Sequence, residues 1–140
     1  MTDERLGNPG DKLVLVVDDD NSVLELVEFM VKKEGFRVEK AVDGAQALHK
    51  ILAQRPDLVL LDLMLPRYGG FEILRQVQVG ETSSIPIVVI TGRYTDHSTS
   101  EMIRQESNVV EFLEKPIKVP VLSALLHRIL KTRPPEIKKT

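Results

Sequence analysis

The sequence predicts an α/β fold, a doubly wound parallel sheet of five strands with helices on both faces. Two observations carry this prediction. Short apolar runs, typical of strands buried on both faces, alternate along the chain with longer segments that carry apolar residues at helical spacing. This strand–helix unit recurs through a chain of 140 residues, a length that suits one domain with a single core.

The strands are identified by their apolar runs. The predicted strands are 13–17, 37–41, 58–61, 85–90 and 109–113. The second of these alternates apolar and polar residues and is therefore expected near an edge of the sheet, whereas the first, third and fourth are the most apolar and are expected innermost. With right-handed crossovers, this pattern fits the strand order 2-1-3-4-5 of flavodoxin-like sheets.

The helices are identified by apolar spacing and by their end signals. They are predicted over about 22–34, between Asp43 and Pro56, over 71–77, weakly over 97–106, and over about 119–131. Asn21 or Ser22 is expected to cap the first helix and Asp43 the second, because such side chains accept hydrogen bonds from the first backbone N–H groups. Gly35 is expected to end the first helix.

Both ends of the chain are predicted to lie outside the domain, which spans 12–131. Residues 1–11 are expected to form a disordered leader, and 132–140 a tail or the stub of a linker. A net charge of −2 gives no basic excess for nucleic-acid binding by the domain, and no apolar run approaches the length of a membrane span. Without a signal peptide or any cysteine, the chain is expected to be cytoplasmic.

Polar residues follow four of the predicted strands. In strand order they are Asp18, Asp19 and Asp20 after the first, Asp62 after the third, Thr91 after the fourth and Lys115 after the fifth. The carboxyl ends of these strands face one crevice in the predicted topology, and ligands bind there in open α/β sheets. Taken alone, Asp62 could equally serve as a turn residue, and the convergence of several strand ends favours a site.

The side chains of this set suit phosphoryl chemistry. Carboxylates in one crevice repel one another unless a cation lies among them, and Mg²⁺ suits one or two carboxylates with waters and phosphate oxygens. An ammonium and a hydroxyl beside such a metal would neutralise and bind phosphoryl oxygens, and Gly92 leaves space for a bulky group beside Thr91. Because an aspartate can carry a phosphoryl group, the chemistry predicts Asp62 as the acceptor.

Four motifs give the chain a family resemblance. Val-Val-Asp-Asp at 16–19, Leu-Leu-Asp-Leu-Met-Leu-Pro at 60–66, Ile-Thr-Gly at 90–92 and Lys-Pro at 115–116 resemble the receiver domain of bacterial two-component response regulators. The resemblance implies a phosphorylation-activated switch rather than a metabolic enzyme, loaded by a sensor histidine kinase or phosphotransfer protein. It also implies a downstream protein target or output domain, and it allows a homodimer on phosphorylation.

The same resemblance implies a role for individual residues. Asp62 would be the phosphoacceptor, Asp19 a direct Mg²⁺ ligand, Asp18 a ligand through water, Met64 a ligand through its carbonyl, Thr91 and Lys115 contacts of the phosphoryl oxygens, and Phe112 the aromatic switch. These residues would also let the domain catalyse its own phosphorylation and dephosphorylation. The Lys115–Pro116 bond would be cis, as X–Pro bonds allow at modest cost.

Each role has a simpler alternative. Asp20 is expected to be a helix cap or a solvated neighbour rather than a ligand. Lys115 could be a surface lysine, Thr91 could merely close a strand, and Phe112 could be a core residue. His127 is expected to be solvated or packed, and it does not resemble a phosphotransfer histidine.

The sequence departs from the family pattern at two places. The loop 67–70 reads Arg-Tyr-Gly-Gly, and 106–108 reads Glu-Ser-Asn, where the family more often has other residues.

Two other classes of function are alternatives to the phosphorylation switch. A docking module that no longer needs phosphate is one of them, and the complete set of acidic residues, Thr91 and Lys115 argues against it. A Mg²⁺-dependent phosphatase or nucleotide enzyme is the other, and the first strand is not followed by a Gly-rich phosphate loop.

Overall fold

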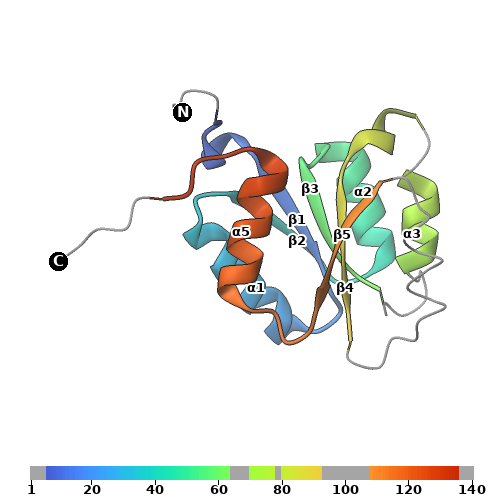
Figure 1. The fold of residues 1–140 in the computed structure, drawn as a ribbon. Coiled ribbons are helices and arrows are strands. Elements are labelled where there is room, and N and C mark those ends of the chain that lie inside the picture. The colour runs from blue at the N-terminus through green and yellow to red at the C-terminus, as the bar shows by residue number, and fades with distance from the viewer. Residues whose placement is uncertain (1–5, 64–69, 78–79, 93–107, 136–140) are drawn as a thin grey trace.

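A computed structural model describes residues 6–63, 70–77, 80–92 and 108–135. Its sheet has five parallel strands in the order β2-β1-β3-β4-β5, which confirms the predicted order (Figure 1). The strands are β1 (Leu13–Val17), β2 (Arg37–Ala41), β3 (Leu58–Asp62), β4 (Ile87–Thr91) and β5 (Val109–Glu114). The fourth strand therefore begins after Pro86 rather than at 85, since proline cannot donate to the ladder.

Helices cover both faces of the sheet (Figure 1). They are α1 (Asn21–Lys33), α2 (Gly44–Gln54), α3 (Gly70–Val77) and α5 (Val119–Leu130), with short 3₁₀ turns at Pro9–Asp11 and Gly80–Ser84. The predicted helix over 97–106 lies outside the described residues, as do Met64 and most of the 67–70 loop. No helix in the described ranges combines the length and apolar character needed to cross a membrane.

The core consists of two layers, one on each side of the sheet. Alternate residues of a strand face opposite layers, so Val14 and Val16 join α1 and α5, while Leu15 and Val17 join α2 and α3. All five residues of β1, β3 and β4 are buried. In contrast, β2 is partly exposed at one edge, as its alternating sequence predicted.

The strand register aligns the carboxyl ends that carry polar residues. Val17 of β1 pairs with Leu61 of β3, so Asp18 and Asp62 are the next residues along two hydrogen-bonded neighbours. Thr91 pairs with Glu114 of β5, one residue before Lys115. Parallel pairing therefore places the acidic residues and the lysine at the same edge of the sheet.

The starts of α1 and α2 show which polar residues act as caps. Asp20 caps α1, and its carboxylate accepts hydrogen bonds from the N–H groups of Ser22 at 2.8 Å and Val23 at 3.4 Å. The prediction of Asn21 or Ser22 as the cap was wrong, because these residues already lie within the helix, whereas the expectation that Asp20 is a helix cap is confirmed. Asp43 caps α2 as predicted.

Residues 6–11 differ from the predicted disordered leader. Pro9–Asp11 forms a 3₁₀ turn capped by the side chain of Asn8, and Gly7 forms a parallel β-bridge with Thr132. Glycine and proline predict loss of regular structure from local preference alone, but the bridge gives Gly7 backbone partners from the other end of the chain. Residues 132–135 are likewise part of the described structure, and the predicted limits 12–131 stay a prediction.

The cap assignment gives a stability test. Asp20→Ala should lower the free energy of unfolding by about 1 kcal/mol in urea titrations, because two helix N–H groups lose their acceptor. Asp20→Asn is the matched control, since asparagine caps as well as aspartate but carries no charge. A loss of the same size in Asp20→Asn would show that the charge, and not the cap, is responsible.

Candidate acidic and phosphoryl-binding site

Three carboxylates form a cluster at the carboxyl edge of the sheet. One oxygen from each of Asp18, Asp19 and Asp62 lies within 4.8 Å of the others. Asp18 is fully buried and Asp62 is 5% exposed, whereas Asp19 is open to solvent. Two buried carboxylates and one exposed carboxylate thus lie close enough together to share one cation.

The side chain of Asp18 is held by its own turn. Its Oδ1 accepts a hydrogen bond of 2.9 Å from the backbone N–H of Asp20. The residue that caps α1 therefore also orients the carboxylate that β1 delivers, a role that the sequence reasoning missed. Its only signal was an aspartate two residues before a predicted helix.

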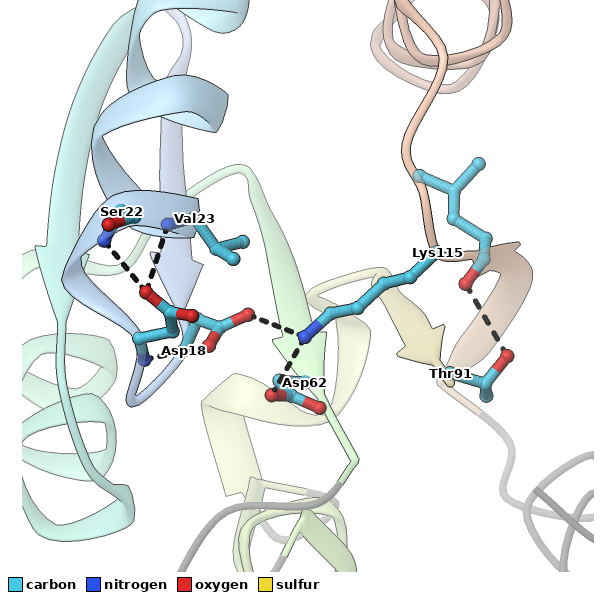
Figure 2. Close-up of polar contacts among 8 residues, drawn as sticks. Asp18, Ser22, Val23, Asp62, Thr91 and Lys115 are labelled. Atoms are coloured by element: carbon cyan, nitrogen blue, oxygen red, sulfur yellow. Dashed lines mark hydrogen bonds and ion pairs between the residues drawn. The ribbon is translucent and has the colours of Figure 1, made fainter. Parts of the chain in front are cut away.

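Lys115 supplies a positive charge to the cluster (Figure 2). Its Nζ lies 3.2 Å from Asp18 Oδ2 and 3.4 Å from Asp62 Oδ2. The Lys115 backbone N–H donates to the Thr91 carbonyl at 2.9 Å, and the bond to Pro116 is cis, as predicted. The side chain of Lys115 thus points across the strand ends of the sheet rather than into solvent, against its reading as an ordinary surface lysine.

The surroundings of Lys115 favour its charged form. Partial burial opposes the charge of the ammonium, but the negative charges of Asp62 and Asp18, together with their hydrogen bonds, outweigh that effect and raise the pKa of Lys115 above 10.5. Lys115 therefore remains a cation at neutral pH.

Thr91 lies at the end of β4 but does not bond to the carboxylates. Its hydroxyl is directed toward β5 and donates to the Leu113 carbonyl at 3.5 Å, a long and weak hydrogen bond (Figure 2). Among the described residues, no atom lies within 4 Å of where a Cβ on Gly92 would be. The structure therefore brings Asp18, Asp19, Asp62 and Lys115 together and leaves Thr91 at the end of the neighbouring strand β4.

Phe112 occupies an intermediate position on β5. It is partly buried and packs against the core layer on the α2 and α3 side. It also lines a groove with Lys115, Pro116 and Val121 on the outer side of β5. This placement suits both a core residue and an aromatic switch, and the switching role stays a prediction.

The acidic cluster fits a hard divalent cation. Its ligand atoms are all carboxylate oxygens, which Mg²⁺ prefers. Asp18 Oδ2 is buried and has no hydrogen bond within the described part of the chain, and only the Lys115 ion pair reaches it. Within the cluster itself, one ammonium faces three carboxylates, so two negative charges remain unbalanced, which is the charge that a divalent cation would neutralise.

Comparison with known proteins identifies the class of protein. A family model described as the response regulator receiver domain matches residues 14–127. The chain belongs to this family, whose members are phosphorylation-dependent signalling switches of two-component systems rather than classical enzymes and bind Mg²⁺ in an acidic pocket. The predicted fold class and the family resemblance are thereby confirmed.

Individual relatives agree with this assignment. The response regulator MprA of Mycobacterium tuberculosis is 36% identical over 123 residues, which are 88% of this chain and 52% of that protein. A response regulator receiver protein from Pseudomonas putida has a TM-score of 0.78 and 28% identity, covering 84% of this chain and 96% of that one. The chain spans about half the length of the curated relatives it matches.

One solved structure bears on the metal. The receiver domain of a sensor histidine kinase from Pseudomonas aeruginosa, with a magnesium ion coordinated in its active site cleft, has a TM-score of 0.76 and 27% identity to this chain. The match covers 85% of this chain and 97% of that one. The ion belongs to that protein, and the acidic cluster is the corresponding candidate here.

The raised pKa of Lys115 predicts a pH-dependent contribution to stability. A cation whose pKa is raised on folding stabilises the folded state fully below its unfolded value, near 10.5, and loses that contribution as the pH rises through the folded value. In the presence of a metal chelator, the free energy of unfolding of Lys115→Met should therefore be lower than that of the wild type by roughly 1–2 kcal/mol at pH 7 in urea titrations. This difference is smaller than for a fully buried ion pair, because Lys115 is partly exposed.

The difference in free energy of unfolding between the wild type and Lys115→Met should stay constant up to about pH 9 and decrease above about pH 10.5. Lys118→Met is the control, because Lys118 lies at the start of α5 and no ion pair of its side chain is found among the described residues. A gap that widened with rising pH would contradict the assigned ion pairs.

Proposed function

We propose that this chain is a Mg²⁺-dependent phosphorylation switch in which Asp62 accepts a phosphoryl group from a histidine kinase or a phosphotransfer protein. The observation that carries the proposal is the position of Lys115, whose ammonium lies between the carboxylates of Asp18 and Asp62. A single cation beside a buried acceptor is the arrangement that stabilises charge transferred onto that acceptor.

The proposed chemistry assigns one task to each group. A carboxylate oxygen of Asp62 would form a bond to phosphorus while the phosphorus–nitrogen bond of the donor's phosphohistidine breaks, and the departing imidazole nitrogen would keep the electron pair and take up a proton from water. Lys115, which is 3.4 Å from Asp62 Oδ2, neutralises charge on the transferred group. Hydrolysis of the aspartyl phosphate would use the same groups, with water as the attacking oxygen.

Asp18 and Asp19 are the residues that would hold Mg²⁺ together with Asp62, and the Met64 carbonyl is proposed as a further ligand. Bound there, the ion would neutralise phosphoryl oxygens and orient the incoming group. The hydrogen bond of 2.9 Å from the Asp20 N–H to Asp18 Oδ1 supports this role, because it restricts the orientation of the carboxylate.

Thr91 and Phe112 are proposed to convert phosphorylation into a change of surface. Breaking the hydrogen bond from the Thr91 hydroxyl to the Leu113 carbonyl costs little free energy, because this bond is 3.5 Å long and therefore weak. A phosphoryl oxygen on Asp62 would be a stronger, charged acceptor. Phe112 lines the groove beside Lys115 and could fill the space that the threonine vacates.

The partners and the cellular location are part of the same proposal. A sensor histidine kinase or phosphotransfer protein would act upstream, and a protein target or an output domain downstream, with a homodimer as one phosphorylated form. The domain itself would not contact nucleic acid, since its net charge is −2, and the protein would act in the cytoplasm.

Phosphorylation by a small donor tests the proposal directly. With acetyl phosphate and Mg²⁺, the wild type should gain one phosphoryl group by intact-protein mass spectrometry, and Asp62→Asn should gain none. Thr91→Ala should still be labelled, because its hydroxyl is not the acceptor. A wild type that stays unlabelled would favour a docking module, and labelled Asp62→Asn would assign the acceptor elsewhere.

Metal binding is predicted to stabilise the folded protein. At a Mg²⁺ concentration of 100 times Kd, the free energy of unfolding should rise by about 2.7 kcal/mol. Asp19→Asn should lose most of this gain, whereas Asp57→Asn should retain it, because Asp57 precedes β3 at the opposite end of the strands and an asparagine oxygen there can still accept from the Leu13 N–H. Equal gains in all three proteins would place the ion outside the acidic cluster.

A further inference from the structure

The two ends of the described chain meet at the edge of the sheet opposite the acidic cluster (Figure 1). Gly7 N–H donates to the Lys131 carbonyl at 2.8 Å, and Arg133 N–H donates to the Gly7 carbonyl at 3.0 Å. Residues 131–133 therefore run beside the N-terminal segment instead of leaving the domain directly after α5.

A partly buried group of polar side chains lies next to this bridge. Glu34 Oε1, just past α1, accepts a hydrogen bond of 2.7 Å from Ser123 Oγ and lies 2.9 Å from His127 Nε2. On the other side of the ring, His127 Nδ1 lies 2.7 Å from Thr132 Oγ1. The four side chains thus form one continuous chain of contacts from α1 through α5 to the residues beyond α5.

The histidine ring is positioned by packing as well as by polar contacts. It is 8% exposed, and its centroid lies 5.0 Å from that of Phe36. Because the Glu34 carboxylate only accepts, Nε2 carries a proton, and the second nitrogen shares one hydrogen with the Thr132 hydroxyl. Every polar atom of the imidazole is therefore paired, which is the condition for burying it without a penalty.

The N-terminal segment is fitted to the same place. The ring of Pro9 would lie 3.1 Å from a Cβ on Gly35, which has a φ of +99° just after α1. Only glycine suits both that backbone conformation and that close approach. Residues 7–11 are consequently held by Gly35 on one side and by residues 131–133 on the other.

We propose that Glu34, Ser123, His127 and Thr132 form a latch that fixes the chain leaving α5 against residues 7–11. The residues after α5 are then a rigid part of the domain rather than a flexible linker. The helix α5 begins close to Lys115 and ends at the latch, so this one helix connects the acidic site to the point where the chain leaves the domain. The latch therefore gives the chain a fixed exit from the domain.

Backbone amides report directly on this latch. In the wild type, NMR order parameters of Thr132 and Arg133 should match those of α5, near 0.85. His127→Phe keeps an aromatic ring against Phe36 but removes both polar contacts. Hydrogen exchange at Gly7 and Arg133 should accelerate at least tenfold in this variant, measured relative to Leu60 in the sheet.

Matched variants separate the latch from general destabilisation. Glu34→Ala should behave like His127→Phe, whereas Glu34→Gln should keep protection, because its amide oxygen can still accept from both α5 side chains. Arg128 lies on α5 beside His127 and forms an exposed ion pair with Glu111 of β5, so Arg128→Ala removes a contact of the same helix and should leave exchange at Gly7 unchanged.

Three outcomes would overturn the latch. The first is an order parameter below about 0.6 at Thr132 and Arg133 in the wild type, a measurement that needs no variant. The second is unchanged protection in both His127→Phe and Glu34→Ala. The third is an equal loss in Arg128→Ala. If the first two variants did not fold, deletion of residues 1–8 should still expose the Arg133 amide, and its continued protection would count against the latch.

Discussion

The ion pairs of Lys115 with Asp18 and Asp62 are the interaction on which the rest of the site depends. Two strands end in buried carboxylates, and such an end is tolerated only where a cation compensates for lost hydration. Lys115 compensates for part of this charge. Within the described cluster, three carboxylates face one ammonium, and this excess of negative charge is the feature that makes the cluster a candidate site for a divalent ion.

The parallel topology makes this concentration of charge possible. Every strand ends at the same edge, so residues far apart in sequence meet there without a separate framework. The helices then separate two tasks. The start of α1 organises the acidic cluster through Asp20, while its far end contributes Glu34 to the contacts that hold the chain ends.

Membership of the receiver family explains why the site is only partly assembled. Lys115 is in contact with Asp18 and Asp62, whereas the Thr91 hydroxyl is bonded to the neighbouring strand β5. A switch needs such a group, because a side chain that is already bound to the acceptor could not respond to its modification. The weak hydrogen bond of Thr91 and the half-buried Phe112 are the features that suit such a response.

The strands, most helix ends and the residues at the site follow from the amino-acid sequence alone. Apolar runs such as 58–61 and caps such as Asp43 depend on neighbours along the chain, so local chemistry predicts them. In contrast, the burial of Asp18, the exposure of Asp19 and the pairing of Gly7 with Thr132 are set by the folded arrangement of the chain. The same arrangement makes His127 bound as well as packed. These features depend on contacts between distant segments, which no local pattern encodes.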